Sequence, residues 1–191
     1  MRIVELIIDE SDEQSGIEAV SLVETPAIEE NFIALNKQQI LLKEVDKEKR
    51  ILMGAALVPN KQIYRRNEKT NDEYYIYFSK DTVRKASELF FKRSNHKNAT
   101  YEHKQPIKGT TIVESWIVEN TKKDKSAHYG LNVPEGTWMI SMKIDDAELY
   151  NKAKEGEIKG FSIEGYFADR YDLQKDDTNQ EIIKQLKDLL K

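Results

Sequence analysis

Short apolar runs separated by polar breaks recur along most of the chain and predict strands. The stretch 51–58 is a continuous apolar run that ends at Pro59, which is typical of a buried strand. The polar stretch 60–71 that follows it predicts an exposed loop. Apolar or β-branched runs bounded by turn residues predict further strands at 1–9, 17–23, 32–35, 73–78, 99–103, 110–118, 136–144 and 158–168.

Apolar residues at helical spacing predict three helices. Ser79 is suited to be the N-cap of a helix whose apolar residues between 83 and 90 share one face. Asp146 caps a second helix that runs through Lys154. A third helix is predicted at 179–191, where the isoleucines and leucines share one face.

The order of these elements indicates the fold class. Many strands are interrupted by few helices, and no regular alternation of strand and helix is present. This pattern predicts an α+β fold with a mainly antiparallel sheet or β-barrel and flanking helices.

The composition excludes several classes of function. The chain has 191 residues with no cysteine, which excludes thiol nucleophiles, disulfides and cysteine-based zinc sites. Its net charge of −4 gives no general attraction to nucleic acid, so no nucleic-acid partner is expected. No apolar stretch is long enough to span a membrane, and the run at 3–8 is too short for a signal peptide.

Ser162 is the first candidate for chemistry. Because side chains alternate along a strand, Ser162, Glu164 and Tyr166 share one face, whereas Phe161 and Ile163 share the other. Nearby glycines leave room for a substrate backbone or for a closely packed loop. From this pattern alone, a solvent-facing polar row on an ordinary half-buried strand is the more frequent interpretation.

The three histidines differ in their surroundings. His96 and His128 lie in polar loops, which predicts surface positions. His103 ends a strand-like segment, where the sheet holds an imidazole that is still accessible, and a catalytic and a structural role both stay open. The sequence contains no helical metal-binding motif and no glycine-rich phosphate loop, so neither metal nor nucleotide chemistry is expected.

Several motifs in a fixed order resemble a known family, the XkdF-like phage serine proteases. These are relatives of the prohead maturation proteases of tailed phages and, more distantly, of the herpesvirus assemblin-type proteases. The motifs that carry the resemblance are GAALVPNKQIYR at 54–65, YEH at 101–103, ESWIV at 114–118, GTWM at 136–139 and KEGEIKGFSIEG at 154–165, with SLVETPAIE at 21–29 upstream.

The resemblance implies roles for individual residues. Ser162 matches the nucleophile of the family and His103 matches its base. Glu114, in the ESWIV motif, is the first choice for the third catalytic residue. Glu164 is the alternative, either as that third member or as a substrate-binding residue. In related prohead proteases the third residue comes well after the serine, whereas Asp169 and Asp172 lie soon after it here. This departure from the family pattern leaves the third catalytic residue open.

The resemblance also implies a fold, a place and a substrate. It implies an assemblin-like α+β fold with a protease domain at 1–174 and a helical tail at 175–191. The expected activity is that of a head maturation endopeptidase inside the procapsid, in the host cytoplasm. Its expected substrates are segments of the scaffold protein and of the major capsid protein, and also the protease itself. No cofactor is expected, and self-association is left open.

Two other functions stay open on the sequence. A catalytically inactive head-assembly or scaffold-binding module would keep the same fold. An esterase or amidase would use the same serine and histidine, although the chain lacks the G-x-S-x-G elbow of common esterases around Ser162.

Overall fold

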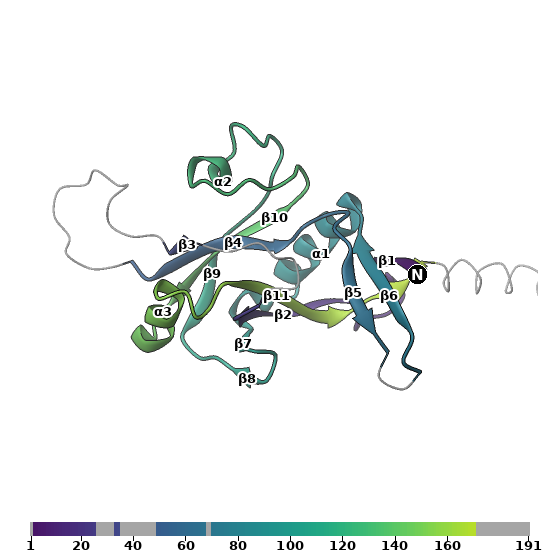
Figure 1. The fold of residues 1–191 in the computed structure, drawn as a ribbon, viewed down its shortest axis with the longest axis horizontal. Helices are drawn as coiled ribbons and strands as arrows, with labels where there is room; N and C mark the ends of the chain where they lie inside the picture. Colours follow the sequence, from purple (N-terminus) through teal and green to yellow (C-terminus); the bar gives the residue numbers. More distant parts are fainter. Residues whose placement is uncertain (1, 26–32, 35–48, 68–69, 171–191) are drawn as a thin grey trace, which may run out of the picture.

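Three four-stranded sheets with peripheral helices form the part of the chain that can be described. The computed structural model describes residues 2–25, 33–34, 49–67 and 70–170 (Figure 1). The predicted helix at 179–191 and the tail that begins at 175 lie outside these residues.

The first two sheets contain most of the long hydrogen-bonded strands. The first has the order β12–β1–β6–β5, formed by β12 (Ala168–Asp169), β1 (Arg2–Ile7), β6 (Glu73–Phe78) and β5 (Ile63–Arg66). The second has the order β3–β4–β10–β9, formed by β3 (Ile33–Ala34), β4 (Ile51–Leu57), β10 (Trp138–Ile144) and β9 (Thr110–Ile117).

The third sheet carries the candidate site. Its order is β11–β2–β7–β8, formed by β11 (Gly160–Tyr166), β2 (Gly16–Val23), β7 (Ala99–Tyr101) and β8 (Gln105–Pro106). In the described residues, the strand pairs are antiparallel except β1 with β6 and β2 with β7.

The predicted α+β class with mainly antiparallel pairing is confirmed, but the predicted barrel is wrong. Within the described residues no sheet closes on itself, and each of the three has two edge strands. The edge strands β3, β8 and β12 have two residues each. Strands this short have too few backbone N–H and C=O groups to form a hydrogen-bonded ladder with the next sheet, as closure of a barrel requires.

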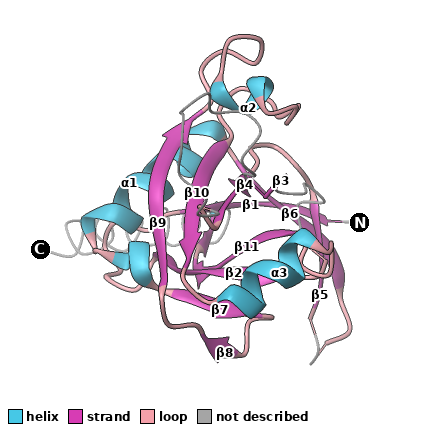
Figure 2. Ribbon diagram, turned by 90° about the vertical axis from the view of Figure 1, so that its left-hand side faces the viewer, coloured by secondary structure: helices cyan, strands magenta, loops and turns pink. Residues whose placement is uncertain are grey.

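The helices begin where their caps predict. α1 (Lys80–Lys92) follows Ser79, whose hydroxyl accepts a hydrogen bond from the backbone N–H of Thr82. α3 (Ala147–Lys154) follows Asp146, whose carboxylate accepts from two backbone N–H groups of the first turn. A short 3₁₀ turn, η2 (Asn95–Lys97), and the one-turn helix α2 (Lys125–His128) complete the set. In Figure 2, α1 and α3 lie toward different sides of the molecule.

The core lies between the sheets and α1. Its largest buried side chain is Trp138 of β10, which meets Phe90 of α1 edge to face at 5.4 Å between ring centroids. The third sheet contributes Val20, Leu22 and Phe161, all fully buried. Because these apolar side chains occupy one face of β2 and β11, the polar side chains of the same strands gather on the other face.

Two local sequence predictions are wrong. The stretch 60–71 contains β5, of which Ile63 alone is buried among three exposed neighbours. The strand predicted at 99–103 ends at Tyr101, so His103 lies in a turn. No helix of the described residues is long and apolar enough to cross a membrane.

Candidate active site

A row of polar side chains crosses the third sheet. Ser162 of β11 pairs with Ser21 of β2, and Ser21 pairs in turn with Thr100 of β7. Residues directly opposite each other on neighbouring strands place their side chains on the same face, with Cβ atoms about 5 Å apart. The three hydroxyl side chains therefore lie side by side on the face opposite the core.

His103 lies in a tight turn at the end of this row. The N–H of Lys104 donates to the carbonyl of Tyr101 at 3.0 Å, so Glu102 and His103 are the two central residues. Both have positive φ, 50° and 56°. Two left-handed residues are the mark of a type I′ turn, where asparagine and glycine are usual. Glu102 and His103 have a Cβ atom, which glycine lacks. Holding such a residue in the left-handed region costs on the order of 1–2 kcal/mol for each residue.

Hydrogen bonds from β2 hold the strained turn in place. The N–H of His103 donates to Ser21 Oγ at 3.0 Å, and the N–H of Glu102 donates to the carbonyl of Leu22 at 3.1 Å. The Glu102 carboxylate accepts from the N–H of Glu24 at 2.6 Å. Ser21 is fully buried, so its contact with His103 is shielded from water. Strained backbone that several contacts hold in place is typical of functional sites.

Glu164 reaches across β2 to meet the imidazole. Its Oε1 lies 3.1 Å from His103 Nδ1, and the hydroxyl of Thr100 donates to the same oxygen. The side chains of His103 and Glu164 are 43% and 30% exposed, so a substrate has access to both. A carboxylate at Nδ1 keeps the proton on that nitrogen and leaves Nε2 as a proton acceptor.

Ser162 is partly buried and its hydroxyl is unengaged. Among the described residues, no hydrogen bond joins Ser162 Oγ to His103 or to another side chain. In enzymes without substrate, catalytic hydrogen bonds are often long or open and tighten when substrate binds. The structure therefore places the serine and the histidine on one face of one sheet, without the contact that catalysis would need.

A close approach of two strands explains why position 165, in the motif that contains Ser162, is a glycine. A Cβ atom at this position would lie 2.0 Å from the carbonyl oxygen of Gly16. The pairing of β11 with β2 shifts register between Glu164 and Gly165, where the two backbones come this close. The glycine is needed for this close approach of β11 to β2, directly beyond Ser162 and Glu164.

Glu114 belongs to a different cluster, in the second sheet. Both of its carboxylate oxygens lie 2.6 Å from Lys125 Nζ, and one accepts from Ser141 Oγ at 2.5 Å. Partial burial tends to raise the pKa of Glu114, but the contacts with Lys125 and Ser141 outweigh it and hold the pKa below its ordinary value. No contact joins Glu114 to His103 in the described residues, so the structure brings Glu164, and not Glu114, to the imidazole.

The remaining candidates lie elsewhere. Asp169 pairs with Arg2 at the edge of the first sheet, and Asp172 lies outside the described residues. His96 stacks on Phe91, and His128 is exposed in the last position of α2. In the ranges that can be described, no group of three or more histidines and carboxylates is placed to bind a metal ion.

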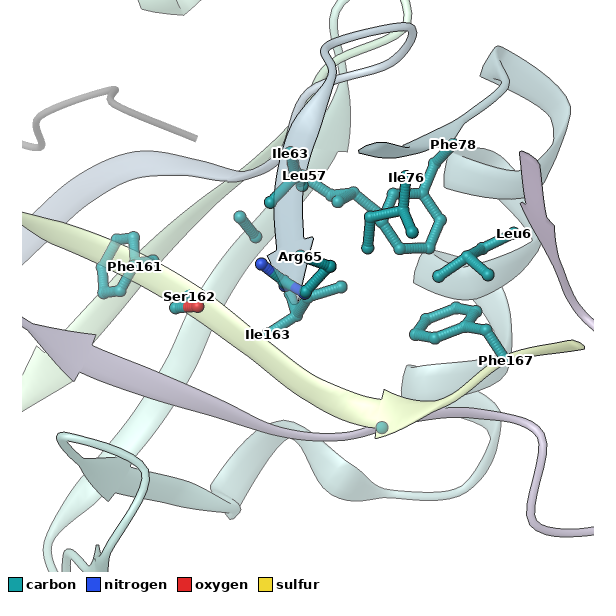
Figure 3. A pocket seen from close by; sticks show the side chains of 12 residues that line it. Leu6, Leu57, Ile63, Arg65, Ile76, Phe78, Phe161, Ser162, Ile163 and Phe167 are labelled. Atoms are coloured by element: carbon teal, nitrogen blue, oxygen red, sulfur yellow. The ribbon is translucent and has the colours of Figure 1, made fainter. Parts of the chain in front are cut away.

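A cavity of about 160 Å³ borders Ser162 on the side toward the first sheet (Figure 3). Its walls are apolar, with the guanidinium of Arg65 reaching from β5 toward the strand that carries Ser162 and Ile163. Sequence reasoning missed Arg65 because its stretch was predicted to be a loop. It also missed Ser21 and Thr100, which look like ordinary strand residues until the pairing of the strands is known.

Comparison with models of protein families gives a match over most of the chain. Residues 37–172 match the family model described as "Putative phage serine protease XkdF". The chain belongs to this family. The match covers His103, Ser162 and Glu164, and it confirms the XkdF-like resemblance. Comparisons with curated proteins and with solved structures give no match.

Proposed function

We propose that this XkdF-family chain is a serine endopeptidase with Ser162 as nucleophile, His103 as general base and Glu164 as the residue that orients the base. The observation that carries the proposal is the contact of Glu164 with His103 Nδ1, on the face of the sheet that also bears Ser162. Three elements are needed to bring these residues together: β11, β2 and the β7–β8 turn.

The proposed reaction is acyl transfer to Ser162. The Oγ of Ser162 bonds to the carbonyl carbon of the substrate while its proton moves to His103 Nε2. The C–N bond then breaks, and the same proton passes from Nε2 to the leaving amine. In the second half of the reaction, His103 Nε2 takes a proton from water as the water attacks the ester, and then returns that proton to Ser162 Oγ as the ester bond breaks. The Glu164 carboxylate stabilises the imidazolium that forms twice in each cycle.

The proposed biological role is maturation of a phage head. The substrates would be segments of the scaffold protein and of the major capsid protein, and the protease itself, inside the procapsid in the host cytoplasm. The family assignment supports a phage protease. The relation to the assemblin fold is a prediction from the sequence motifs, and so are the partners.

Co-expression with the neighbouring head proteins tests this function. Intact masses would be compared for the wild type, Ser162→Ala and His103→Ala, with circular dichroism to show that all three fold. We expect defined fragments of a head protein with the wild type and none with either variant. The same fragments from all three would remove Ser162 and His103 from catalysis.

One observation favours a second candidate, an inactive head-assembly module that keeps the protease fold. Ser162 and His103 are not in hydrogen-bond contact in the described residues. An inactive module predicts no fragments with assembled procapsids present, together with retained binding of the scaffold protein by all three proteins.

A further inference from the structure

The cavity beside Ser162 is sized for a single side chain. Its volume is about 160 Å³, which suits one group the size of a benzene ring. The apolar walls come from three sheets, through residues of β1, β4, β5, β6 and β11 and through Phe167. Among its lining residues Arg65 alone carries a charge.

Arg65 lacks an anionic partner among the described residues. Its Nη1 donates to the carbonyl oxygen of Tyr64 at 3.0 Å, and no described carboxylate forms an ion pair with it. Arg65 is exposed, as Arg2 and Arg170 are, but Arg2 and Arg170 each pair with a carboxylate. Loss of water around the Arg65 guanidinium lowers its pKa, although an arginine stays charged at neutral pH. An arginine that borders apolar walls and has no ion-pair partner can bind an incoming carboxylate through charge-assisted hydrogen bonds.

We infer that this cavity receives an acidic side chain, glutamate or aspartate, from the substrate residue that contributes the scissile carbonyl. The apolar walls would pack against the methylene groups, and the Arg65 guanidinium would bind the carboxylate in its fork geometry. Ser162 borders the cavity from β11, an edge strand of the third sheet, so a substrate that crosses this edge would present its carbonyl to the Ser162 hydroxyl and its side chain to the cavity. This inference rests on the proposed function, for which it names the substrate class.

Phosphonate probes that react with the active-site serine test the inference. Three peptidyl diphenyl phosphonates, identical except for a glutamate, glutamine or lysine side chain next to phosphorus, would be compared by their inactivation rate constants. The proteins are the wild type, Arg65→Ala, Arg65→Glu and the matched control Arg66→Ala. Arg66 is the next residue of β5, is exposed, does not line the cavity, and bonds to Asn71. A plain fluorophosphonate without a side chain reports the nucleophile separately.

The expected result is a preference that depends on Arg65. The wild type and Arg66→Ala should react with the glutamate probe about 10- to 100-fold faster than with the glutamine probe, the range for one charge-assisted hydrogen-bonded pair. Arg65→Ala should lose that preference, and Arg65→Glu should favour the lysine probe.

Three results would overturn the inference, and they separate it from the proposed function. Labelling of Ser162 by the plain probe with no glutamate preference would overturn the acidic subsite and leave the nucleophile intact. An equal loss of rate for all probes in Arg65→Ala would assign Arg65 to the developing oxyanion instead. No labelling by the plain probe would overturn the nucleophile, and the subsite with it.

Discussion

Two glutamates compete for one role, and their surroundings separate them. Glu164 contacts His103 Nδ1, whereas Glu114 binds Lys125 and Ser141 in another sheet. In the sequence Glu114 is the stronger choice because it belongs to a motif, ESWIV. The position of a carboxylate relative to the imidazole decides its role, and strand pairing sets that position.

Replacing Glu164 by glutamine should slow the reaction while the fold stays intact. The amide cannot stabilise the imidazolium, and its NH₂ group favours the wrong tautomer of His103. We expect a loss of roughly 10²- to 10⁴-fold in the rate of fluorophosphonate labelling, by analogy with the acid-to-amide change in a serine triad. Glu114→Gln is the matched control and should label at the wild-type rate; the opposite ranking would return Glu114 to the site.

Gly165→Ala should destabilise the protein, because its Cβ would lie 2.0 Å from the Gly16 carbonyl oxygen. The two strands must separate, which we expect to lower the free energy of unfolding by about 1–3 kcal/mol or more. The control is Gly130→Ala, where a Cβ meets nothing within 4 Å and only the positive φ of 79° is unfavourable. Urea unfolding of the two variants measures the difference, and equal losses would refute the role of the close approach.

At the scale of elements, the β7–β8 turn depends on β2. Ser21→Ala removes the acceptor for the N–H of His103 in a fully buried position. We expect a loss of about 1–3 kcal/mol in the free energy of unfolding, the cost of leaving a buried donor unpaired. Labelling of Ser162 should also slow, because the turn that presents the imidazole loosens.

Ser162→Ala is the matched control for Ser21→Ala, since it makes the same change one strand away in the same polar row. It should abolish labelling with little change in stability. A stable Ser21→Ala variant that labels at the wild-type rate would show that the turn needs no support from β2.

α2 is tied to β9 by an ion pair whose strength depends on pH. The pKa of Glu114 lies below its ordinary value of 4.5, so its contribution to stability is present above that pH and is lost as the pH falls through the lower folded-state value. The pair is partly exposed, so we expect Glu114→Gln to cost at most about 1 kcal/mol at pH 7. In urea unfolding, the stability gap to the wild type should stay constant as long as the pH is above 4.5 and shrink as the pH falls below 4.5; a gap that stays constant below pH 4.5 would contradict the ion pair.

The sequence predicts the long elements well and the short ones poorly. α1 and α3 were found because Ser79 and Asp146 are effective caps. The sequence does not predict β5, because Ile63 is the one buried side chain of this strand. A strand with one buried side chain shows no alternation of apolar and polar residues. The candidate residues Ser162, His103 and Glu164 could be named from motifs, but the contact with Glu164 depends on the parallel pairing of β2 with β7. No local pattern encodes such a long-range pairing.

At the scale of the molecule, the third sheet and the first sheet together carry the two parts of the proposed site. The polar face of the third sheet carries Ser162, His103 and Glu164, and the cavity toward the first sheet carries Arg65. β11 belongs to both, since its residues line the cavity and also bear the polar row. The proposed nucleophile and the proposed side-chain subsite therefore share one strand, β11.

The most direct test is the reaction of the purified wild-type protein with a plain fluorophosphonate, followed by intact mass measurement and peptide mapping. The account predicts a single adduct on Ser162 that is absent from Ser162→Ala and strongly slowed in His103→Ala. An unreacted wild-type protein, or an adduct on another residue, would contradict Ser162 as the nucleophile.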